Sequence, residues 1–225
     1  MRAKLIKDTC LYASVLISLS FASLAQNTPW WELHGAFQFT NSQTGQVQDV
    51  VNSVASFTGS PSVNVGTRLN MIGWDFSAQE NTNSWFGGIV DFSGGYGSKS
   101  VTLFPPKGTP SVAKFSPALF TMGGGPQFSF RHNERIQPFF RVILAAAYSN
   151  LNPNTSISNI VNAKFPAPST SDTNLALLFG SGFDYRLKRY AFFRIAGDYI
   201  HTFVFEKSEN NFRVTAGVSF RIGNK

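Results

Sequence analysis

Acidic and basic side chains recur on alternating positions of several segments, and they have the greatest capacity for chemistry in this chain. The candidates are Glu32, Asp75, Asp91, Asp184 and Asp198 against Arg131, Arg141, Arg186, Arg194, Arg213 and Arg221. In the interior of a closed sheet these charges must pair, because an isolated buried charge is strongly unfavourable. The sequence therefore predicts a lumen charge network of Glu32, Asp75, Asp91, Arg141, Asp184, Arg194, Asp198 and Arg213.

Two roles for this network are open. In the first, salt bridges plug the barrel and serve structure alone. In the second, an arginine exchanges carboxylate partners and admits ions, which would make a narrow gated, porin-like channel. A barrel of about eight strands is barely wide enough for its own side chains, so the plug is favoured over a broad pore.

The elements that must position these charges show a period of two after Pro29, broken by clusters of Gly, Asn, Ser and Pro. We expect strands near 31–41, 67–79, 85–96, 118–131, 137–149, 174–186, 191–205 and 211–223. Each is long enough to cross a bilayer as a tilted strand of about 9–11 residues. The pattern predicts an all-β fold, an eight-stranded antiparallel up-and-down transmembrane β-barrel.

The alternation is clearest in the last segment. Phe212, Val214 and Phe220 share one face, while Arg213 and Arg221 share the other. A membrane barrel turns the apolar face to lipid and the polar face, with its charges and small residues, to the lumen. A soluble lipocalin-like binding barrel or a sandwich would do the reverse and remains the alternative.

Aromatic residues gather toward both ends of the expected strands, as in the interfacial girdles of membrane barrels. One group is Trp74, Phe76, Phe86, Phe128, Phe130, Phe140, Tyr185, Phe193 and Phe220, and the other is Phe39, Tyr96, Phe120, Tyr148, Phe203, Phe205 and Phe212. The chain is 15% aromatic and 14% charged, well below the roughly 25% charged residues of soluble domains.

The connections alternate between long and short. Long ones span about 42–66, 97–117 and 150–173, whereas 80–84, 132–136 and 187–190 are short. Outer-membrane barrels have short periplasmic turns and long external loops, so we expect the short turns and both mature termini in the periplasm. The long loops are expected to be mobile and external. Asp49–Phe57 is a candidate for a short helix, although its helix propensities are mixed.

The first 25 residues have the three parts of a secretory signal peptide. Arg2, Lys4 and Lys7 precede an apolar run, and Ser23 and Ala25 stand before a cut at Gln26. We therefore expect a signal peptide at 1–25 and one barrel domain at 26–225. The mature part retains 16 basic and 11 acidic residues and no cysteine, since Cys10 lies in the signal segment. Disulfides are excluded, and without a basic cluster no nucleic acid is expected.

Catalytic and cofactor motifs are weak. His34, His132 and His201 lack metal-ligand spacing, and Gly123–Gly125 does not lead into the helix of a phosphate loop. His201 falls on the lipid-facing set, where some barrels that modify lipid A acyl chains place a His–Ser pair, but Thr202 follows it instead. We expect no enzyme, no catalytic residue, no metal and no cofactor, with a lipid A enzyme as the remote alternative.

Two resemblances add to this interpretation. Thr215, Gly217, Phe220 and Ile222 resemble the C-terminal assembly signal of bacterial outer-membrane barrels, although Gly223, Asn224 and Lys225 follow. This resemblance implies recognition by the outer-membrane barrel insertion machinery.

The segments Asp91–Tyr96, Gly124–Pro126, Phe128–Arg131, Pro138–Arg141 and Asp198–Tyr199, together with the closing strand, resemble the small OmpA-like outer-membrane β-barrel family. The likeness covers nearly all of 31–223, without the C-terminal peptidoglycan-binding domain of larger members. It implies a structural or surface-interaction barrel in the outer membrane of a Gram-negative cell envelope. Its expected surroundings are outer-membrane lipid and lipopolysaccharide, with an unknown surface ligand at the long loops.

Overall fold

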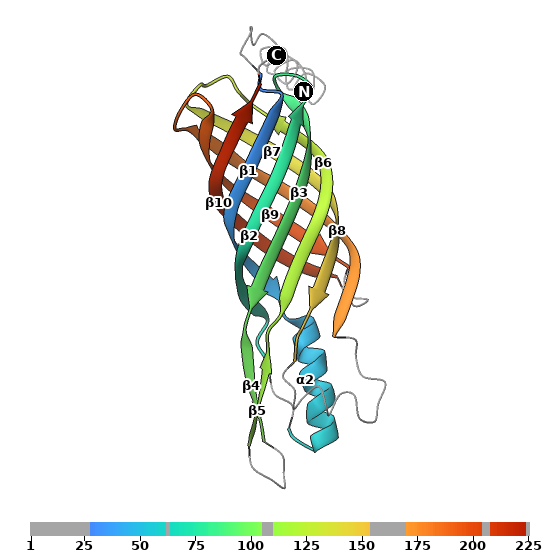
Figure 1. Ribbon diagram of the computed structural model, residues 1–225. Coiled ribbons are helices and arrows are strands. Elements are labelled where there is room, and N and C mark those ends of the chain that lie inside the picture. The colour runs from blue at the N-terminus through green and yellow to red at the C-terminus, as the bar shows by residue number, and fades with distance from the viewer. Residues whose placement is uncertain (1–27, 62–63, 105–109, 154–169, 204–207, 224–225) are drawn as a thin grey trace, which may run out of the picture.

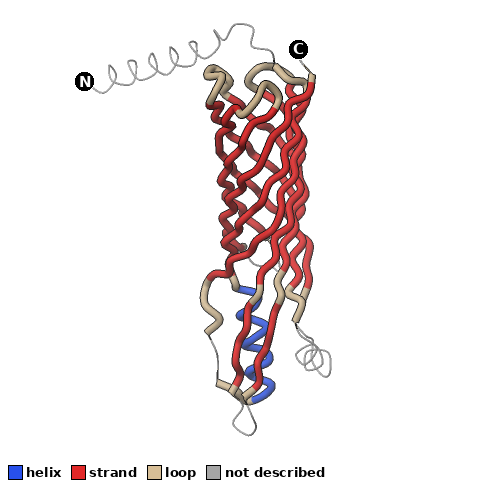
Figure 2. Tube along the Cα trace, turned by 60° about the vertical axis from the view of Figure 1, so that its left-hand side comes forward, coloured by secondary structure: helices blue, strands red, loops and turns tan. Residues whose placement is uncertain are grey.

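The computed structural model describes residues 28–61, 64–104, 110–153, 170–203 and 208–223. Most of them form one closed antiparallel barrel with the order β1-β10-β9-β8-β7-β6-β3-β2 (Figures 1 and 2). Its strands are β1 (Trp31–Gln43), β2 (Arg68–Asn81), β3 (Phe86–Gly97), β6 (Ala118–Ser129), β7 (Ile136–Asn150), β8 (Ser171–Arg186), β9 (Ala191–Thr202) and β10 (Glu209–Ile222). Each strand neighbours the next in sequence, and β1 meets β10, so the predicted up-and-down barrel is confirmed.

The expected strand ranges agree with the observed bounds within three residues at each end. The sheet closes where β1 pairs with β10 in a continuous register from Trp31↔Ile222 to Asn41↔Phe212. Closure pairs every strand with a neighbour on both sides over most of its length, so the barrel has no free sheet edge. The expected signal peptide and Phe205 lie outside the described residues.

The two ends of the barrel differ. Short turns and the described chain ends gather at one end, where the Trp30 backbone amide donates to the carbonyl of Ile222 over 3.1 Å. The opposite end carries a helix and a separate hairpin (Figures 1 and 2). We call these the short-turn end and the cap end.

The helix α2 (Gly45–Thr58) extends the expected Asp49–Phe57 segment in both directions. Val47, Val50, Val51 and Val54 lie at the i, i+3, i+4, i+7 spacing that forms one apolar stripe, and all four are buried. Gly59 ends the helix at φ 66°, a left-handed conformation that glycine adopts without steric cost.

The hairpin of β4 (Lys99–Leu103) and β5 (Ser111–Phe115) was not expected from the sequence. Its inward residues form a hydrophobic cluster with α2, which we call the cap core. The cap core consists of Val47, Val50, Val51, Val54, Ala55, Val65, Val101, Leu103, Ala113, Phe115 and Leu151. The first two long connections, which were expected to be mobile, therefore contain packed structure, because their apolar residues bury one another.

Candidate functional site

The outer wall of the barrel is apolar and exposed, whereas its interior holds the charges. Phe37 is 85% exposed and Ile72 is 70% exposed, while Arg141 and Arg213 on inward positions are each 1% exposed. In water such a wall would be strongly unfavourable, but in a bilayer lipid covers it. This inversion decides between the two barrels that the sequence left open, and the apolar face points outward.

The aromatic girdles lie near both ends of that wall. Trp85, Phe86 and Phe128 contact one another at the short-turn end, and Phe120 lies 5.5 Å from Tyr96 between ring centroids toward the cap end. Trp74 was predicted to lie in one of these girdles, and that prediction is wrong. Its register partners Phe37 and Gly94 place it midway along the wall.

Five of the predicted lumen residues form a central network. Arg213 contacts Asp75 at 3.0 Å, Asp91 at 3.1 Å and Asp198 at 2.9 Å. Arg141 contacts Asp198 at 2.9 Å and Asp91 at 3.3 Å. The residues come from β2, β3, β7, β9 and β10, so the network ties together strands from around the whole barrel.

A second network lies toward the short-turn end. Arg194 forms a bidentate pair with Asp184, with Nε–Oδ1 at 2.6 Å and Nη2–Oδ2 at 2.8 Å, and it also contacts Glu32 at 3.1 Å. Glu32 accepts a further hydrogen bond of 2.6 Å from Arg131, and Arg221 lies 3.1 Å from Asp184. Such planar paired contacts suit guanidinium groups in a dry interior.

Two arginines of this second network also lie over aromatic rings. The guanidinium carbon of Arg194 is 4.6 Å from the centroid of Phe139, and that of Arg221 is 3.6 Å from the centroid of Phe192. Sequence reasoning missed both rings because aromatic residues were assigned to the lipid face. Phe139 lies two residues before Arg141, and Phe192 lies two residues before Arg194. Because side chains alternate along a strand, this spacing would have placed both rings on the lumen face.

Arg186 is not part of the lumen networks. Its side chain is 36% exposed and pairs with Glu134 at 2.8 Å beside a short turn. The position follows from the strand end, because β8 finishes at Arg186 and its last inward residue emerges from the barrel. The sequence candidate Arg186 is therefore corrected to a surface ion pair.

Much of the lumen wall toward the cap end is apolar, and buried Thr40, Ser42, Thr202 and Asn211 form the polar part of the wall at this end. We call the apolar cluster the apolar layer, and it consists of Leu69, Met71, Ile89, Leu119, Ile143, Ala145, Ala147, Ala176, Leu178 and Ile200. Ile89 precedes Asp91 on β3 and therefore lies on the short-turn side of that carboxylate. The expectation of a lumen filled by charges and small polar residues is wrong here, because strands that face lipid on one side and a dry interior on the other carry apolar residues on both faces.

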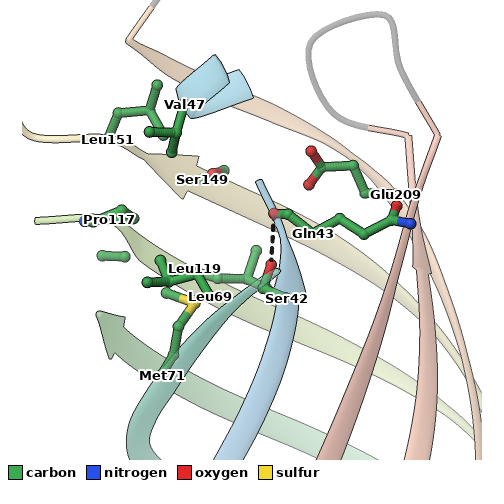
Figure 3. Close-up of a pocket in the computed structure, with 11 residues that line it drawn as sticks. Ser42, Gln43, Val47, Leu69, Met71, Pro117, Leu119, Ser149, Leu151 and Glu209 are labelled. Atoms are coloured by element: carbon green, nitrogen blue, oxygen red, sulfur yellow. Dashed lines mark hydrogen bonds between the residues drawn. The ribbon is translucent and has the colours of Figure 1, made fainter. Parts of the chain in front are cut away.

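The barrel mouth meets the cap at a small pocket (Figure 3). Val47 of α2 and Leu151 approach it from the cap, while Leu69, Met71 and Leu119 line its floor. Gln43 and Glu209 lie on its polar side, and Ser42 donates to the backbone oxygen of Gln43 over 3.4 Å. The cap therefore sits on the apolar layer, and the two together cover the charged interior from this end.

The three histidines are separated. His34 is buried in the lumen, with Nδ1 3.2 Å from the carbonyl oxygen of Val218 and Nε2 3.8 Å from Asp75. His201 lies near the cap end with Nδ1 2.7 Å from Asn210 Oδ1, and His132 lies in a short turn. In the described part of the chain no group of three or more His, Cys, Asp or Glu is arranged to hold a metal ion.

Comparisons with solved structures identify the architecture. Neisserial surface protein A shares 11% identity over 88% of this chain and 100% of its own, with a TM-score of 0.56. The chain has the fold of a small outer-membrane β-barrel. Ail, the attachment invasion locus protein of Yersinia pestis, is 13% identical over 84% and 99% of the two chains with a TM-score of 0.48. The outer membrane protein AlkL is 15% identical over 89% and 93%, with a TM-score of 0.39.

No family model and no curated protein sequence matches the chain. Among the described residues no helix is long and apolar enough to span a membrane.

Proposed function

We propose that this protein is an integral outer-membrane barrel of the OmpA-like kind, with a structural or surface-interaction role carried by its cap. The proposal rests on the division of the molecule into a closed barrel and a separately packed cap. A lumen closed by ion pairs and an apolar layer serves as a rigid support, and a separately packed helix and hairpin project from one end. Rigid scaffolds that present outer elements are a common arrangement for binding.

The outer membrane of a Gram-negative envelope suits the exposed apolar wall and the predicted secretory segment. We propose that Thr215, Gly217, Phe220 and Ile222 on β10 present the assembly signal to the barrel insertion machinery. Phe220 and Ile222 are about half exposed on the lipid side, whereas Thr215 faces the lumen. Outer-membrane lipid and lipopolysaccharide would then cover the wall.

The proposed orientation places the short turns and both mature termini in the periplasm and the cap outside the cell. Long external loops and short periplasmic turns are usual in this class. The cap presents exposed Phe104 and Val112 beside its polar residues, which gives it a surface for a partner. We propose no nucleic-acid partner, no cofactor and no catalytic activity.

A narrow ion channel is the second candidate, and one observation favours it. Arg141 and Arg213 each contact more than one carboxylate, so either guanidinium has alternative partners. The complete burial of both guanidinium groups opposes it, because an ion would need an open path past them in a barrel barely wide enough for its own side chains. We therefore favour the closed barrel.

Localisation is tested by comparing boiled and unboiled samples of isolated outer membranes on a gel, since a folded barrel resists SDS and changes mobility on heating. The expected result is a heat-dependent shift in that fraction. Protein recovered from the soluble periplasm without such a shift would contradict the proposal.

Orientation is tested with single cysteines, because the predicted mature chain contains none. Ser56→Cys lies on the exposed side of α2, and Lys188→Cys lies in an exposed short turn. A membrane-impermeant maleimide should label Ser56→Cys on intact cells and Lys188→Cys only after lysis. The opposite pattern would place the cap in the periplasm and remove its proposed surface role.

A further inference from the structure

One wall of the lumen contains buried polar atoms without a hydrogen-bond partner in the described part of the chain. They are His34 Nε2, Gln38 Oε1, Thr40 Oγ1, Asp75 Oδ1, Thr215 Oγ1 and Ser219 Oγ, whereas Asp75 Oδ2 has an ion-pair contact with Arg213 at 3.0 Å. Each of these side chains belongs to a residue no more than 6% exposed. We call this set the polar seam.

The seam is continuous because its residues lie on three adjacent strands, β10, β1 and β2. His34 stands opposite Ser219, and Gln38 stands opposite Thr215, in the register of β1 and β10. Asp75 stands opposite Ala36 on the other side of β1. Along the ladder of β1 and β10, the pair of Ala36 and Gly217 lies between the His34–Ser219 pair and the Gln38–Thr215 pair. Alanine and glycine add little side-chain volume between these two polar pairs.

The chemistry of the seam is dominated by acceptors. Carboxylate and amide oxygens only accept hydrogen bonds, and hydroxyl oxygens accept as well as donate. Buried polar groups in folded proteins are nearly always hydrogen-bonded to protein or to ordered water. Within the described residues the only cationic contact of Asp75 shorter than 3.5 Å is Arg213, which reaches Oδ2. The described side chains therefore leave the remaining atoms without a hydrogen-bond donor.

The central network beside the seam also has an excess of negative charge. Among the residues that the structure describes, Asp75, Asp91 and Asp198 form ion pairs with two arginines, Arg141 and Arg213. The second network has the opposite excess, with Arg131, Arg194 and Arg221 against Glu32 and Asp184. That compensation lies toward the short-turn end, whereas the seam runs alongside the three central carboxylates.

We propose that the polar seam is a solvent-binding site that holds a short file of water molecules and one positive charge next to Asp75. The charge is either a proton on the His34–Asp75 pair or a monovalent alkali cation coordinated by seam oxygens. The groups that face it are His34 from β1, Asp91 from β3, Arg141 from β7, Arg194 and Asp198 from β9, and Arg213 from β10. The site does not depend on which way the barrel faces in the membrane.

The occupant is identified on the folded wild-type barrel. Crystals grown with rubidium or thallium should show an anomalous peak beside Asp75 if the charge is an alkali cation. If it is a proton, the carboxyl ¹³C shift of Asp75 or the ring ¹⁵N shifts of His34 should report protonation at neutral pH. An ionised Asp75 with a neutral His34 and no anomalous peak would overturn the positive charge.

The water file is tested by Thr215→Val, which keeps the side-chain shape and removes the hydroxyl. If water bonds the hydroxyl, the valine variant should unfold at lower urea concentration than the wild type, and ordered water near residue 215 should be lost from the crystal structure. An unchanged or raised urea midpoint would overturn the file, because removing a truly unpaired buried hydroxyl is neutral or stabilising.

Thr121→Val is the matched control, since Thr121 Oγ1 already lies 2.7 Å from Ser93 Oγ. Its lowered midpoint gives the effect of losing a hydroxyl that is known to be bonded. Thr215→Val should fall in the same range if the seam is solvated.

Discussion

Arg213 Nε lies 2.9 Å from Asp198 Oδ2, and the two residues stand directly opposite each other in the register of β9 and β10. Both side chains are completely buried. The same guanidinium group reaches Asp75 on β2 and Asp91 on β3. Arg213 therefore links the last two strands of the chain to strands on the far side of the closure between β1 and β10.

Replacing this arginine should be strongly destabilising. Arg213→Leu leaves three buried carboxylates with one fewer cation, and breaking a buried pair in this way typically costs about 3–5 kcal/mol. The variant should lose its heat-resistant folded band at a lower urea concentration than the wild type. Arg186→Leu is the control, because its half-exposed pair with Glu134 should contribute about 0–1 kcal/mol. Equal midpoints for the two variants would refute a structural plug.

The bidentate pair of Arg194 and Asp184 should show coupling in a double-mutant cycle. Their atoms meet at 2.6 Å and 2.8 Å, so each single replacement removes the same contacts. Arg194→Met and Asp184→Asn together should be less destabilising than the sum of the single effects, by about 0.5–3 kcal/mol. The measurement is the free energy of unfolding in lipid or detergent, and strict additivity would show that the two side chains act independently.

The barrel and the membership of its charge networks could be predicted because strand alternation fixes which residues share a face. This alternation alone is enough to assign the following residues to the lumen face: Glu32, Asp75, Asp91, Arg141 and Asp198. Their partners could not be predicted, since Arg141 on β7 meets Asp198 on β9 across the intervening strand β8, and the pairing depends on the register of the strands.

The cap and the apolar layer escaped prediction for a different reason. Ile143 and Leu178 are apolar although they lie on the lumen face. Where both faces of a strand carry apolar residues, the sequence alternation does not show which face points to lipid. The hairpin β4–β5 is short and its stability comes from contacts with α2, which lies far away in the sequence. Local sequence periodicity does not reveal contacts between segments that lie so far apart in the chain.

The cap should be separable from the barrel. Val51→Asp places a charge in the cap core, where Val51 is 1% exposed, and should disorder α2 and the hairpin. The cap core shares no residue with the apolar layer, so the barrel should keep its heat-dependent mobility. Limited proteolysis should cut the variant in residues 45–66 while sparing the strands. Asn52→Asp on the exposed side is the control, and loss of the folded barrel in Val51→Asp would show that the cap is needed for assembly.

The lumen should remain closed to ions when one charged residue of the central network is removed. Arg141→Ala deletes contacts with Asp91 and Asp198 but leaves Ile143 and Leu178, both 0% exposed, in the apolar layer above. Planar bilayers containing verified folded protein should therefore show no discrete conductance for the wild type, for Arg141→Ala or for Asp91→Ala. Discrete openings that differ among these three proteins would favour the gated channel.

Glycines on the two faces of the sheet should respond differently to substitution. A Cβ added at Gly217 would overlap the backbone of Gly35 and Ala36, whereas at Gly197 it would meet nothing within 4 Å. Gly217→Ala should therefore lower the free energy of unfolding by about 1–3 kcal/mol through forced displacement of β1. Gly197→Ala should be neutral or raise it by about 0.4–1 kcal/mol, because alanine restricts the unfolded chain.

Purified protein refolded into detergent is the right sample for this comparison, since Gly217 also belongs to the predicted assembly signal. Urea titrations of the refolded variants report stability without the insertion machinery. If Gly217→Ala matched Gly197→Ala in detergent but accumulated poorly in outer membranes, Gly217 would matter for recognition during assembly. A lowered midpoint in detergent would instead assign it to the close approach of β1 and β10 at the barrel closure.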